Sequence, residues 1–464
     1  MPRRVSRRRF LRRAGTGAAG VVILGGGLSA RSFAANNSVG VGLVGVSGRG
    51  AWFMSLLGRK GYGMRPAALC DVNSKRAAEA FAAFPDVPKF ADFRTMLDKQ
   101  GKDIDGVIAA TPEFSRAIIL AAAIKAGKAV LGEKPLTRTP HEARVLRELA
   151  RKHKAVTQMG NQGSSRTTFQ QAKALVHAGL LGDLKEVHVW SGGSEPRSDA
   201  PRKVGRDRTP PTGSQPVPGG LHWDLWLAGA ARRDYHVEWY QWKRWRDFFT
   251  SSLGWAGPHS AALGFMSAKI HELWDAVDLP KDKRTIRVTP KVPGVYKVGL
   301  PQWEIIRYDV PARGRMAPLT FTWHKGAMHF IEKALGGYPE WRDKKPRPWW
   351  THGGSAFVGT KGKLDATHYG DHWNVYPAEL AKADALKGIR GEGHEQQWIK
   401  AIRGQSKTVS NFDVSGPLTE LLMLGNVATL VGEPLTYDPV TGTVLDHPAA
   451  QAALHTPYRK GWSL

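Results

Sequence analysis

The segment from 45 to 50 reads Gly-Val-Ser-Gly-Arg-Gly and directly follows the apolar, β-branched run 39–44. The residues from 49 to 57 have the composition of a helix. Glycine at such a turn lets the backbone approach an anion, and the N–H groups at the start of the helix point toward it. The order of strand, glycine turn and helix predicts a site for the pyrophosphate of a dinucleotide. The usual fingerprint has glycine where Ser47 stands. Gly48 next to it supplies backbone freedom, and the Ser47 hydroxyl is a further phosphate donor.

A carboxylate closes the next apolar run of the chain. Asp71 follows residues 67–70 and stands 26 positions after Gly45. An acidic residue at this distance accepts hydrogen bonds from the adenosine ribose hydroxyls and repels a 2′-phosphate. We therefore expect the cofactor to be NAD, while Lys75 and Arg76 nearby leave room for NADP.

These residues need a scaffold, and the first third of the chain alternates strands with helices. The expected strands are 39–44, 67–70, 107–110, 129–131 and 156–159, and the expected helices are 49–57, 74–83, 93–99, 115–126 and 140–152. This alternation predicts an α/β Rossmann-type, doubly wound parallel sheet whose ligands lie beyond the carboxyl ends of the strands. Polar residues fall at three further strand ends, 111–112, 133–135 and 160–161. The residues expected to contact the cofactor are Gly45, Ser47, Gly48, Arg49, Gly50, Asp71, Thr111, Pro112, Glu133, Lys134 and Asn161.

The second part of the chain has a different pattern. Strands are expected at 186–191, 286–288, 303–310, 319–323, 355–358 and 363–366, and helices at 169–178, 395–402 and 417–431. Such a run of strands predicts an α+β domain with a large, mainly antiparallel open sheet. Residues 194–220 are rich in Pro, Gly, Arg and Ser, and a loop of this length is typical of a lid or an oligomer contact. No spacing of His, Cys, Asp and Glu typical of a metal site stands out.

Aromatic residues gather between 223 and 255. Core or interface packing is the expected role for most of the six tryptophans there, although flat rings also stack on sugars. Those six are Trp223, Trp226, Trp239, Trp242, Trp245 and Trp255.

The first 34 residues differ from the rest of the chain. They hold eight arginines and no acidic residue, and an apolar Gly/Ala-rich run follows Ser6-Arg7-Arg8-Arg9-Phe10-Leu11. This order is typical of a signal peptide of the twin-arginine type, and predicts an exported, periplasmic protein with no stable membrane span after cleavage. The domains are thus expected at 1–34 (signal), 36–160 (NAD(P)-binding) and 161–464 (substrate and oligomerisation, with the C-terminal tail packing back).

The net charge of the chain is +27, and its basic residues are scattered along the sequence. They accompany no nucleic-acid-binding motif, so no nucleic-acid partner is expected.

The sequence resembles the Gfo/Idh/MocA oxidoreductase family, in particular its exported branch with a twin-arginine signal. The resemblance rests on the glycine turn, Asp71, Ala110-Thr111-Pro112 and Gly132-Glu133-Lys134-Pro135-Leu136, and continues along nearly the whole mature chain. It implies that Lys134 lies beside the nicotinamide and the substrate hydroxyl. A partly desolvated ammonium there has a lowered pKa and can relay a proton. It also implies a homo-oligomer.

The same resemblance implies a second catalytic pair, an Asp and a His four residues apart on one face of a helix. The matching segment, 242–259, has the histidine at His259 but Trp255 at the Asp position, and tryptophan cannot transfer a proton. A second alignment with the same family segment, along residues 263–272, puts Lys269 at the His position and Phe265 at the Asp position. His271 and Glu272 are the reserve candidates. Arg116 stands where relatives often carry His, either as an anion-binding group or as an ordinary helix residue.

Three functions are consistent with these residues. The first is an NAD(P)-dependent oxidoreductase that acts on a secondary hydroxyl of a sugar, polyol or glycoside, with Lys134 and His259 as the catalytic residues. The second is a redox-neutral lyase, epimerase or glycoside hydrolase with tightly bound NAD. The third is a non-catalytic carbohydrate-binding protein, a reading supported by Trp255 at the Asp position.

Overall fold

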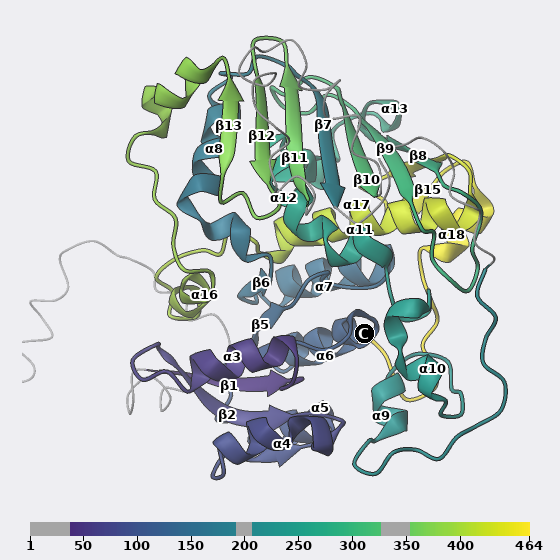
Figure 1. Cartoon of the computed structure of the whole chain (residues 1–464). Helices are drawn as coiled ribbons and strands as arrows, with labels where there is room; N and C mark the ends of the chain where they lie inside the picture. The colour runs from purple at the N-terminus through teal and green to yellow at the C-terminus, as the bar shows by residue number, and fades with distance from the viewer. Residues whose placement is uncertain (1–37, 192–206, 326–352) are drawn as a thin grey trace, which may run out of the picture.

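A computed structural model describes residues 38–191, 207–325 and 353–464 of the chain. The predicted signal segment 1–34 and residues 194–206 of the predicted loop lie outside the described residues. The described residues form two sheets, with several helices between them (Figure 1). The predicted fold class is confirmed, because one sheet is parallel and the other is mainly antiparallel.

The first sheet has the strand order β3-β2-β1-β4-β5-β6, and every pairing in it is parallel. Helices α3, α4 and α16 cover one face, and α5, α6 and α7 cover the other. Both faces are therefore buried, as the apolar strands of a doubly wound sheet require. The elements are β1 (Val39–Val44), α3 (Arg49–Leu57), β2 (Met64–Cys70), α4 (Ser74–Ala83), β3 (Lys89–Phe90), α5 (Phe93–Gln100), β4 (Gly106–Ala109), α6 (Glu113–Lys125), β5 (Ala129–Gly132), α7 (Pro140–Lys152), β6 (Thr157–Met159) and α16 (His394–Ile402).

Within the described residues, the second sheet comprises nine strands in the order β13-β12-β11-β7-β10-β9-β8-β14-β15. The pair β7 and β10 is parallel, and the other pairings are antiparallel. The strands are β7 (Leu184–Ser191), β8 (Ile286–Lys291), β9 (Glu304–Val310), β10 (Leu319–Lys325), β11 (Gly354–Gly359), β12 (Lys363–Thr367), β13 (Trp373–Tyr376), β14 (Leu435–Asp438) and β15 (Thr443–Val444).

Three helices lie between the second sheet and α7 (Figure 1). They are α11 (Ser251–Trp255), α12 (Gly257–Ser267) and α17 (Phe412–Val431). Helix α17 is 20 residues long and apolar enough to cross a membrane by length and composition, yet most of it is buried inside the protein. It packs against α7 on one side and against β8 on the other. The apolar surface of α17 is therefore accounted for by the core that joins the two sheets.

The start of α17 corrects one sequence expectation. The sequence predicts a helix that begins at Pro417, because proline is favoured in the first turn of a helix. The helix instead begins at Phe412, since the Asn411 side chain caps it by accepting a hydrogen bond from the Asp413 N–H at 3.0 Å. Pro417 then stands inside the helix, six residues beyond the cap.

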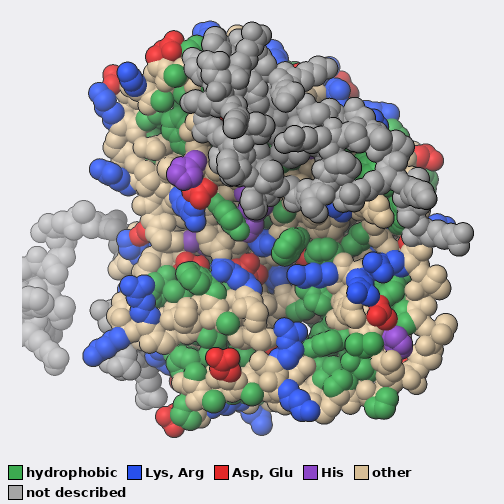
Figure 2. Space-filling model, viewed as in Figure 1, with side chains coloured by type: hydrophobic (Ala, Val, Ile, Leu, Met, Phe, Trp, Pro, Cys, Tyr) green, Lys and Arg blue, Asp and Glu red, His purple; other side chains and the backbone are tan. Residues whose placement is uncertain are grey.

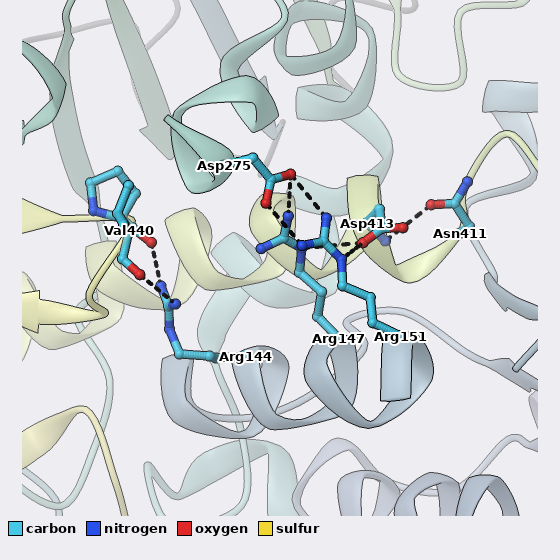
Figure 3. A network of polar contacts seen from close by, with 8 residues as sticks. Arg144, Arg147, Arg151, Asp275, Asn411, Asp413 and Val440 are labelled. Carbon is cyan, nitrogen blue, oxygen red and sulfur yellow. Dashed lines mark hydrogen bonds and ion pairs between the residues drawn. The ribbon is translucent and has the colours of Figure 1, made fainter. Parts of the chain in front are cut away.

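A charged network joins α7 to the second half of the chain (Figure 3). The Arg147 guanidinium contacts Asp275, the last residue of the 3-10 helix η3 (Ile270–Asp275), at 2.6 Å, and Asp413 at 3.4 Å. Arg151 contacts the same two carboxylates at 2.9 and 2.5 Å. Arg147 is buried, so its charge requires these partners. The network fixes how α7 and α17 lie relative to one another.

The Asp275 carboxyl should make stability depend on pH. Hydrogen bonds from Arg151, followed by those from Arg147, lower its pKa from 3.8 to about 2. A lowered folded-state pKa adds stability above the unfolded value, which is lost as the pH falls from about 4 toward 2. We predict that Asp275→Asn lowers the free energy of unfolding in urea at pH 7, and that the difference from wild type shrinks below pH 4. The exposed Asp282 carries the control, Asp282→Asn, which should cost little at any pH.

Candidate active site

A cleft of about 560 Å³ lies at the carboxyl ends of the parallel strands. One wall comes from the first sheet, and the other comes from residues 225–259, Tyr369 and Trp462. Charged side chains of both signs gather along the boundary between the two halves (Figure 2). Most of the site residues expected from the sequence line this cleft, namely Gly45, Ser47, Gly48, Arg49, Asp71, Thr111, Pro112, Glu133, Lys134 and His259.

The glycine turn has the geometry of a phosphate cradle. Gly45 has φ +82°, and a Cβ there would lie 3.0 Å from the backbone of Ala110. Gly48 has φ +59°, and a Cβ there would have no neighbour within 4 Å, so the open side of the turn faces the cleft. Such a turn leaves room for a pyrophosphate beside backbone N–H groups at the start of α3. The residues present therefore fit the dinucleotide that the sequence predicts.

Asp71 extends this cradle toward the adenosine end. Its two carboxylate oxygens accept hydrogen bonds from the Val46 N–H at 3.1 Å and the Asn73 N–H at 2.9 Å. Burial raises the pKa of Asp71 above its usual value, while these backbone donors lower it. The carboxylate lines the cleft and has acceptor capacity left for a ribose hydroxyl beside these backbone donors.

Arg116 is hydrogen-bonded to two loops of the cleft. The guanidinium is buried and donates to the backbone carbonyl of Thr111 at 2.5 Å and to that of Pro135. Burial lowers the pKa of Arg116 to about 10, which leaves it charged at neutral pH. The side chain lines the cleft, but two of its nitrogens are engaged by the protein itself. Of the two roles considered from the sequence, this geometry favours the structural one.

Lys134 follows β5 and reaches across the cleft. Its Nζ donates to the main-chain carbonyl of Trp255 at 2.5 Å and lies 5.1 Å from the centre of the Trp255 ring. Burial lowers the pKa of Lys134 to about 8 against the opposing effect of Glu133 and Glu113. The neighbouring Glu133 pairs with Arg49 at 2.7 Å. Lys134 thus exchanges a proton readily near neutral pH.

His259 lies in the first turn of α12 and is 7% exposed. Its ring is 5.1 Å from the His368 ring and 4.6 Å from the Tyr369 ring. Burial, followed by the charge of Lys134, holds the pKa of His259 well below 6.5, so the imidazole is neutral at pH 7. Its Nδ1 is buried and has no hydrogen-bond partner among the described residues. Because Nδ1 is inaccessible, the small exposed part of the ring is what His259 contributes to the cleft lining.

The Trp255 and His259 positions do not share one helix. Helix α11 ends at Trp255 and α12 begins at Gly257, with Ala256 between them. Trp255 is 50% exposed and lines the cleft, so it occupies the site without a group that transfers protons.

The second alignment with the family segment, along residues 263–272, places none of its candidate residues at the cleft. Phe265 is fully buried in the core. Lys269 and Glu272 pair with one another at 3.6 Å, and the His271 ring lies near Phe265, away from the cleft lining. His259 is therefore the histidine of the predicted set that the fold brings to Lys134.

Two of the expected cofactor contacts lie behind the cleft wall. A Cβ on Gly50 would lie 1.9 Å from the Gly45 carbonyl oxygen, so this glycine serves close packing of the turn. Asn161 is fully buried, and its Oδ1 accepts a hydrogen bond from the Ser410 hydroxyl at 2.5 Å. Neither residue is among those that line the cleft.

Sequence reasoning missed Glu113. This buried carboxylate begins α6, lines the cleft and accepts hydrogen bonds from both the N–H and the hydroxyl of Thr250 at 2.5 Å. Burial raises the pKa of Glu113 to about 7. Its position directly after Thr111-Pro112, at the end of a strand, is the signal that would have found it.

Aromatic and cationic residues from distant segments complete the cleft. Trp223, Trp226 and Trp245 are buried in an aromatic cluster, which agrees with a packing role. Trp242 belongs to the 3-10 helix η2 (Trp242–Arg244) and lines the cleft. Further residues of the lining that the sequence did not single out are Tyr240, Lys243, Tyr369 and Trp462. Among the described residues no group of three His, Cys, Asp or Glu side chains is arranged to hold a metal ion.

The fold and the cleft define a dinucleotide-binding protein, and comparison with known proteins shows what one segment of the chain is similar to. Residues 39–161 match the Gfo/Idh/MocA family model, described as an oxidoreductase family with an NAD-binding Rossmann fold. The matched segment comprises the strands of the first sheet, and the match agrees with the dinucleotide site expected there.

Curated relatives match only part of the chain. Inositol 2-dehydrogenase 1 of Saccharopolyspora erythraea is 30% identical over 153 residues, which is 32% of this chain and 45% of that protein. The uncharacterized oxidoreductase YfiI of Bacillus subtilis is 31% identical over 103 residues, which is 22% of this chain and 26% of that protein. The chain therefore spans less than half the length of these relatives.

Solved structures extend the likeness to both halves. Levoglucosan dehydrogenase in complex with NADH and L-sorbose has a TM-score of 0.55 at 15% identity, covering 86% of this chain and 99% of that one. The WlbA dehydrogenase of Bordetella pertussis in complex with NADH and UDP-GlcNAcA has a TM-score of 0.53 at 14% identity, covering 86% and 98%. At these identities the likeness concerns the fold.

Asp71 provides a test of the cofactor site. We predict that Asp71→Asn weakens NADH binding about 10- to 100-fold, because a hydrogen bond to a charged group contributes ~1.5–3 kcal/mol. Fluorescence titration with NADH measures the Kd, and thermal unfolding reports whether the turn survives. Asp98→Asn removes an exposed carboxylate of α5 as the matched control. Equal affinity of the Asp71 and Asp98 variants would contradict this role.

Proposed function

We propose that the protein is an NAD-dependent oxidoreductase that acts on a secondary hydroxyl of a sugar, polyol or glycoside. The observation that carries the proposal is the position of Lys134, a half-buried amine with a pKa of about 8, in the same cleft as the glycine turn and Asp71. The Rossmann-domain match supports it. The names of relatives, an inositol 2-dehydrogenase and a levoglucosan dehydrogenase, favour a polyhydroxylated substrate.

The chain supplies proton transfer and orientation. The bound nicotinamide supplies the two-electron redox chemistry. Neutral Lys134 accepts the hydroxyl proton of the substrate, and its Nζ is held for this by the Trp255 carbonyl. The neutral imidazole of His259, which lines the same cleft, holds a second position on the substrate. Arg116 keeps the loops before and after the reacting position at fixed separation through its bonds to Thr111 and Pro135.

Lys134 provides the test. We predict that Lys134→Met lowers kcat about 10²- to 10⁴-fold, the usual contribution of a positioned acid–base group, while the Kd of NADH changes little. In the wild type the rate of alcohol oxidation should rise with pH and level off above about 8, because the neutral amine is the base. NADH formation is followed with inositol, levoglucosan and UDP-GlcNAcA as probes.

The control variant is Lys102→Met, which removes an exposed lysine outside the cleft. Full activity of Lys134→Met, or a rate independent of pH between 6 and 10, would refute the assignment.

A second candidate function is favoured by the aromatic residues over the cleft. The Tyr240 hydroxyl accepts a hydrogen bond from the Asn73 side chain at 3.1 Å, beside Asp71. Trp462 approaches Phe93 with ring centres 6.3 Å apart, and both rings line the cleft. Rings that converge on the adenosine end favour a nucleotide retained between turnovers. The alternative is therefore a redox-neutral lyase, epimerase or glycoside hydrolase with tightly bound NAD.

Export and nucleotide retention can be tested together, since we also propose that the twin-arginine segment exports the protein folded with its nucleotide. Protein recovered from the periplasm should release about one equivalent of NAD(H) on heating, and Arg7→Lys with Arg8→Lys should keep the protein in the cytoplasm. Net reduction of many equivalents of added NAD supports the dehydrogenase, and turnover without it supports the redox-neutral enzyme. Protein without nucleotide, whose sugar affinity is unchanged by Lys134→Ala, would support the non-catalytic alternative.

A further inference from the structure

The partner of the Lys134 amine is unusual. Its Nζ donates to a main-chain carbonyl, that of Trp255, at 2.5 Å. The nearby carboxylates have other partners, since Glu133 pairs with Arg49 and Glu113 accepts from Thr250. The acceptor that fixes the position of this amine is therefore a backbone group, whatever side chain stands at 255.

The break between α11 and α12 explains why that carbonyl is available. In an uninterrupted helix the N–H of residue 259 donates to the carbonyl of residue 255. Here the His259 N–H donates to the Ala256 carbonyl at 3.0 Å, and the Ser260 N–H donates to the same carbonyl at 3.2 Å. Pro258, in the first turn of α12, has no N–H to donate to the Gly254 carbonyl, so the two helices do not run on into one another by the usual hydrogen bonds. The Trp255 carbonyl is thus left at the end of α11, facing the cleft.

The short helix α11 is fixed at its other end by buried polar contacts. Glu113 of the first half accepts the Thr250 N–H, and the Asn426 side chain of α17 donates to the Thr250 carbonyl at 2.9 Å. Ser251 has φ +61°, a strained conformation for a serine, and its hydroxyl contacts buried Glu304 at 3.5 Å. Five residues held in this way carry the Trp255 carbonyl at a fixed distance from α6.

We propose that the main-chain carbonyl of Trp255, freed by the helix break at Ala256 just before Pro258 and held through Glu113, is the positioning group for the Lys134 amine. The proposal rests on the proposed function, in which Lys134 transfers the proton. A carbonyl accepts a hydrogen bond from either the charged or the neutral amine. It therefore holds Nζ in place without the strong preference for the ammonium that a carboxylate imposes.

The charged groups around Lys134 agree with this role. Glu133 and Glu113 raise its pKa, whereas Arg116 and Lys243 lower it, and His259 is neutral. Lys243 lies 4.8 Å from the centre of the same Trp255 ring. The nearest acceptor contributes no charge of its own, so burial sets the proton affinity of the amine.

The test compares variants of the break with variants of the side chain. Pro258→Ala supplies an N–H that can donate to the Gly254 carbonyl, which lets α11 run on into α12. In the continuous helix the residue-259 N–H would donate to the Trp255 carbonyl and draw it away from Lys134. We expect kcat to fall at least about tenfold, as for a misplaced catalytic group. Pro448→Ala, at the exposed first position of the helix Pro448–Ala453, is the matched control and should leave kcat unchanged.

Trp255→Asp adds a carboxylate beside the amine and should raise the pKa of Lys134 by about 1–3. Trp255→Phe keeps the carbonyl and should leave that pKa near its wild-type value. The pKa is read without substrate or nucleotide, by NMR of ¹³C-dimethylated lysines, with Lys134→Arg assigning the signal. The pH profile of kcat should follow the same order.

Each result separates this inference from the proposed function. If Lys134→Met remains active, the proposed function fails. If Lys134 is essential but folded Pro258→Ala keeps wild-type kcat and Lys134 pKa, the positioning role is overturned. If Pro258→Ala does not fold, the two Trp255 variants decide. The positioning role is overturned if Trp255→Phe shifts the Lys134 pKa as much as Trp255→Asp does. The side chain of residue 255, and not its carbonyl, would then control the amine.

Discussion

The packing of α7 against α17 is the constraint on which the cleft depends. Each wall of the cleft belongs to a different half of the chain, so the distance between Lys134 and Trp255 is set by how those halves meet. The guanidinium groups of Arg147 and Arg151 hold that contact through Asp275 and Asp413. Because Arg147 is buried, any other arrangement of the two halves would leave its charge without partners.

The site also contains several buried charged side chains. Glu113, Arg116 and Glu133 are all nearly inaccessible, yet each is engaged by a backbone group, a hydroxyl or a cation. The half-buried Lys134, with a pKa of about 8, and Glu113, with a pKa of about 7, are the groups that titrate near neutral pH, while His259 stays neutral. A low-dielectric cleft of this kind strengthens each remaining interaction with a ligand.

The sequence predicts the scaffold well because strand and helix periods are local properties. The bounds 39–44, 49–57, 74–83 and 140–152 agree with β1, α3, α4 and α7 residue for residue. The start of α17 differs because the Asn411 cap outweighs the preference of Pro417 for a first turn. The glycine turn, Asp71, Lys134 and His259 were found because each lies in a recognisable motif or a resembling segment, and all line one cleft.

What the sequence misses depends on contacts between distant segments. In the sequence, Glu113 is a glutamate in the first turn of a helix, where acidic residues are common. Its hydrogen bond from the distant Thr250 is visible only in the structure. The replacement of Asp by Trp255 looks like a lost function in a side-chain comparison, because no sequence pattern shows where a carbonyl points. Gly50 and Asn161 show the converse, since a motif position can serve packing behind a wall.

The path of the C-terminal segment has a consequence for the order in which the site is made. The Tyr458 hydroxyl donates to Glu142 of α7 at 2.6 Å, and Trp462 lines the cleft beside Phe93. The Rossmann domain emerges from the ribosome early and can fold as a unit. The wall over its nucleotide site is complete only after residue 462 has been synthesised. A nucleotide therefore meets an open cradle on the nascent chain and an enclosed one on the finished protein.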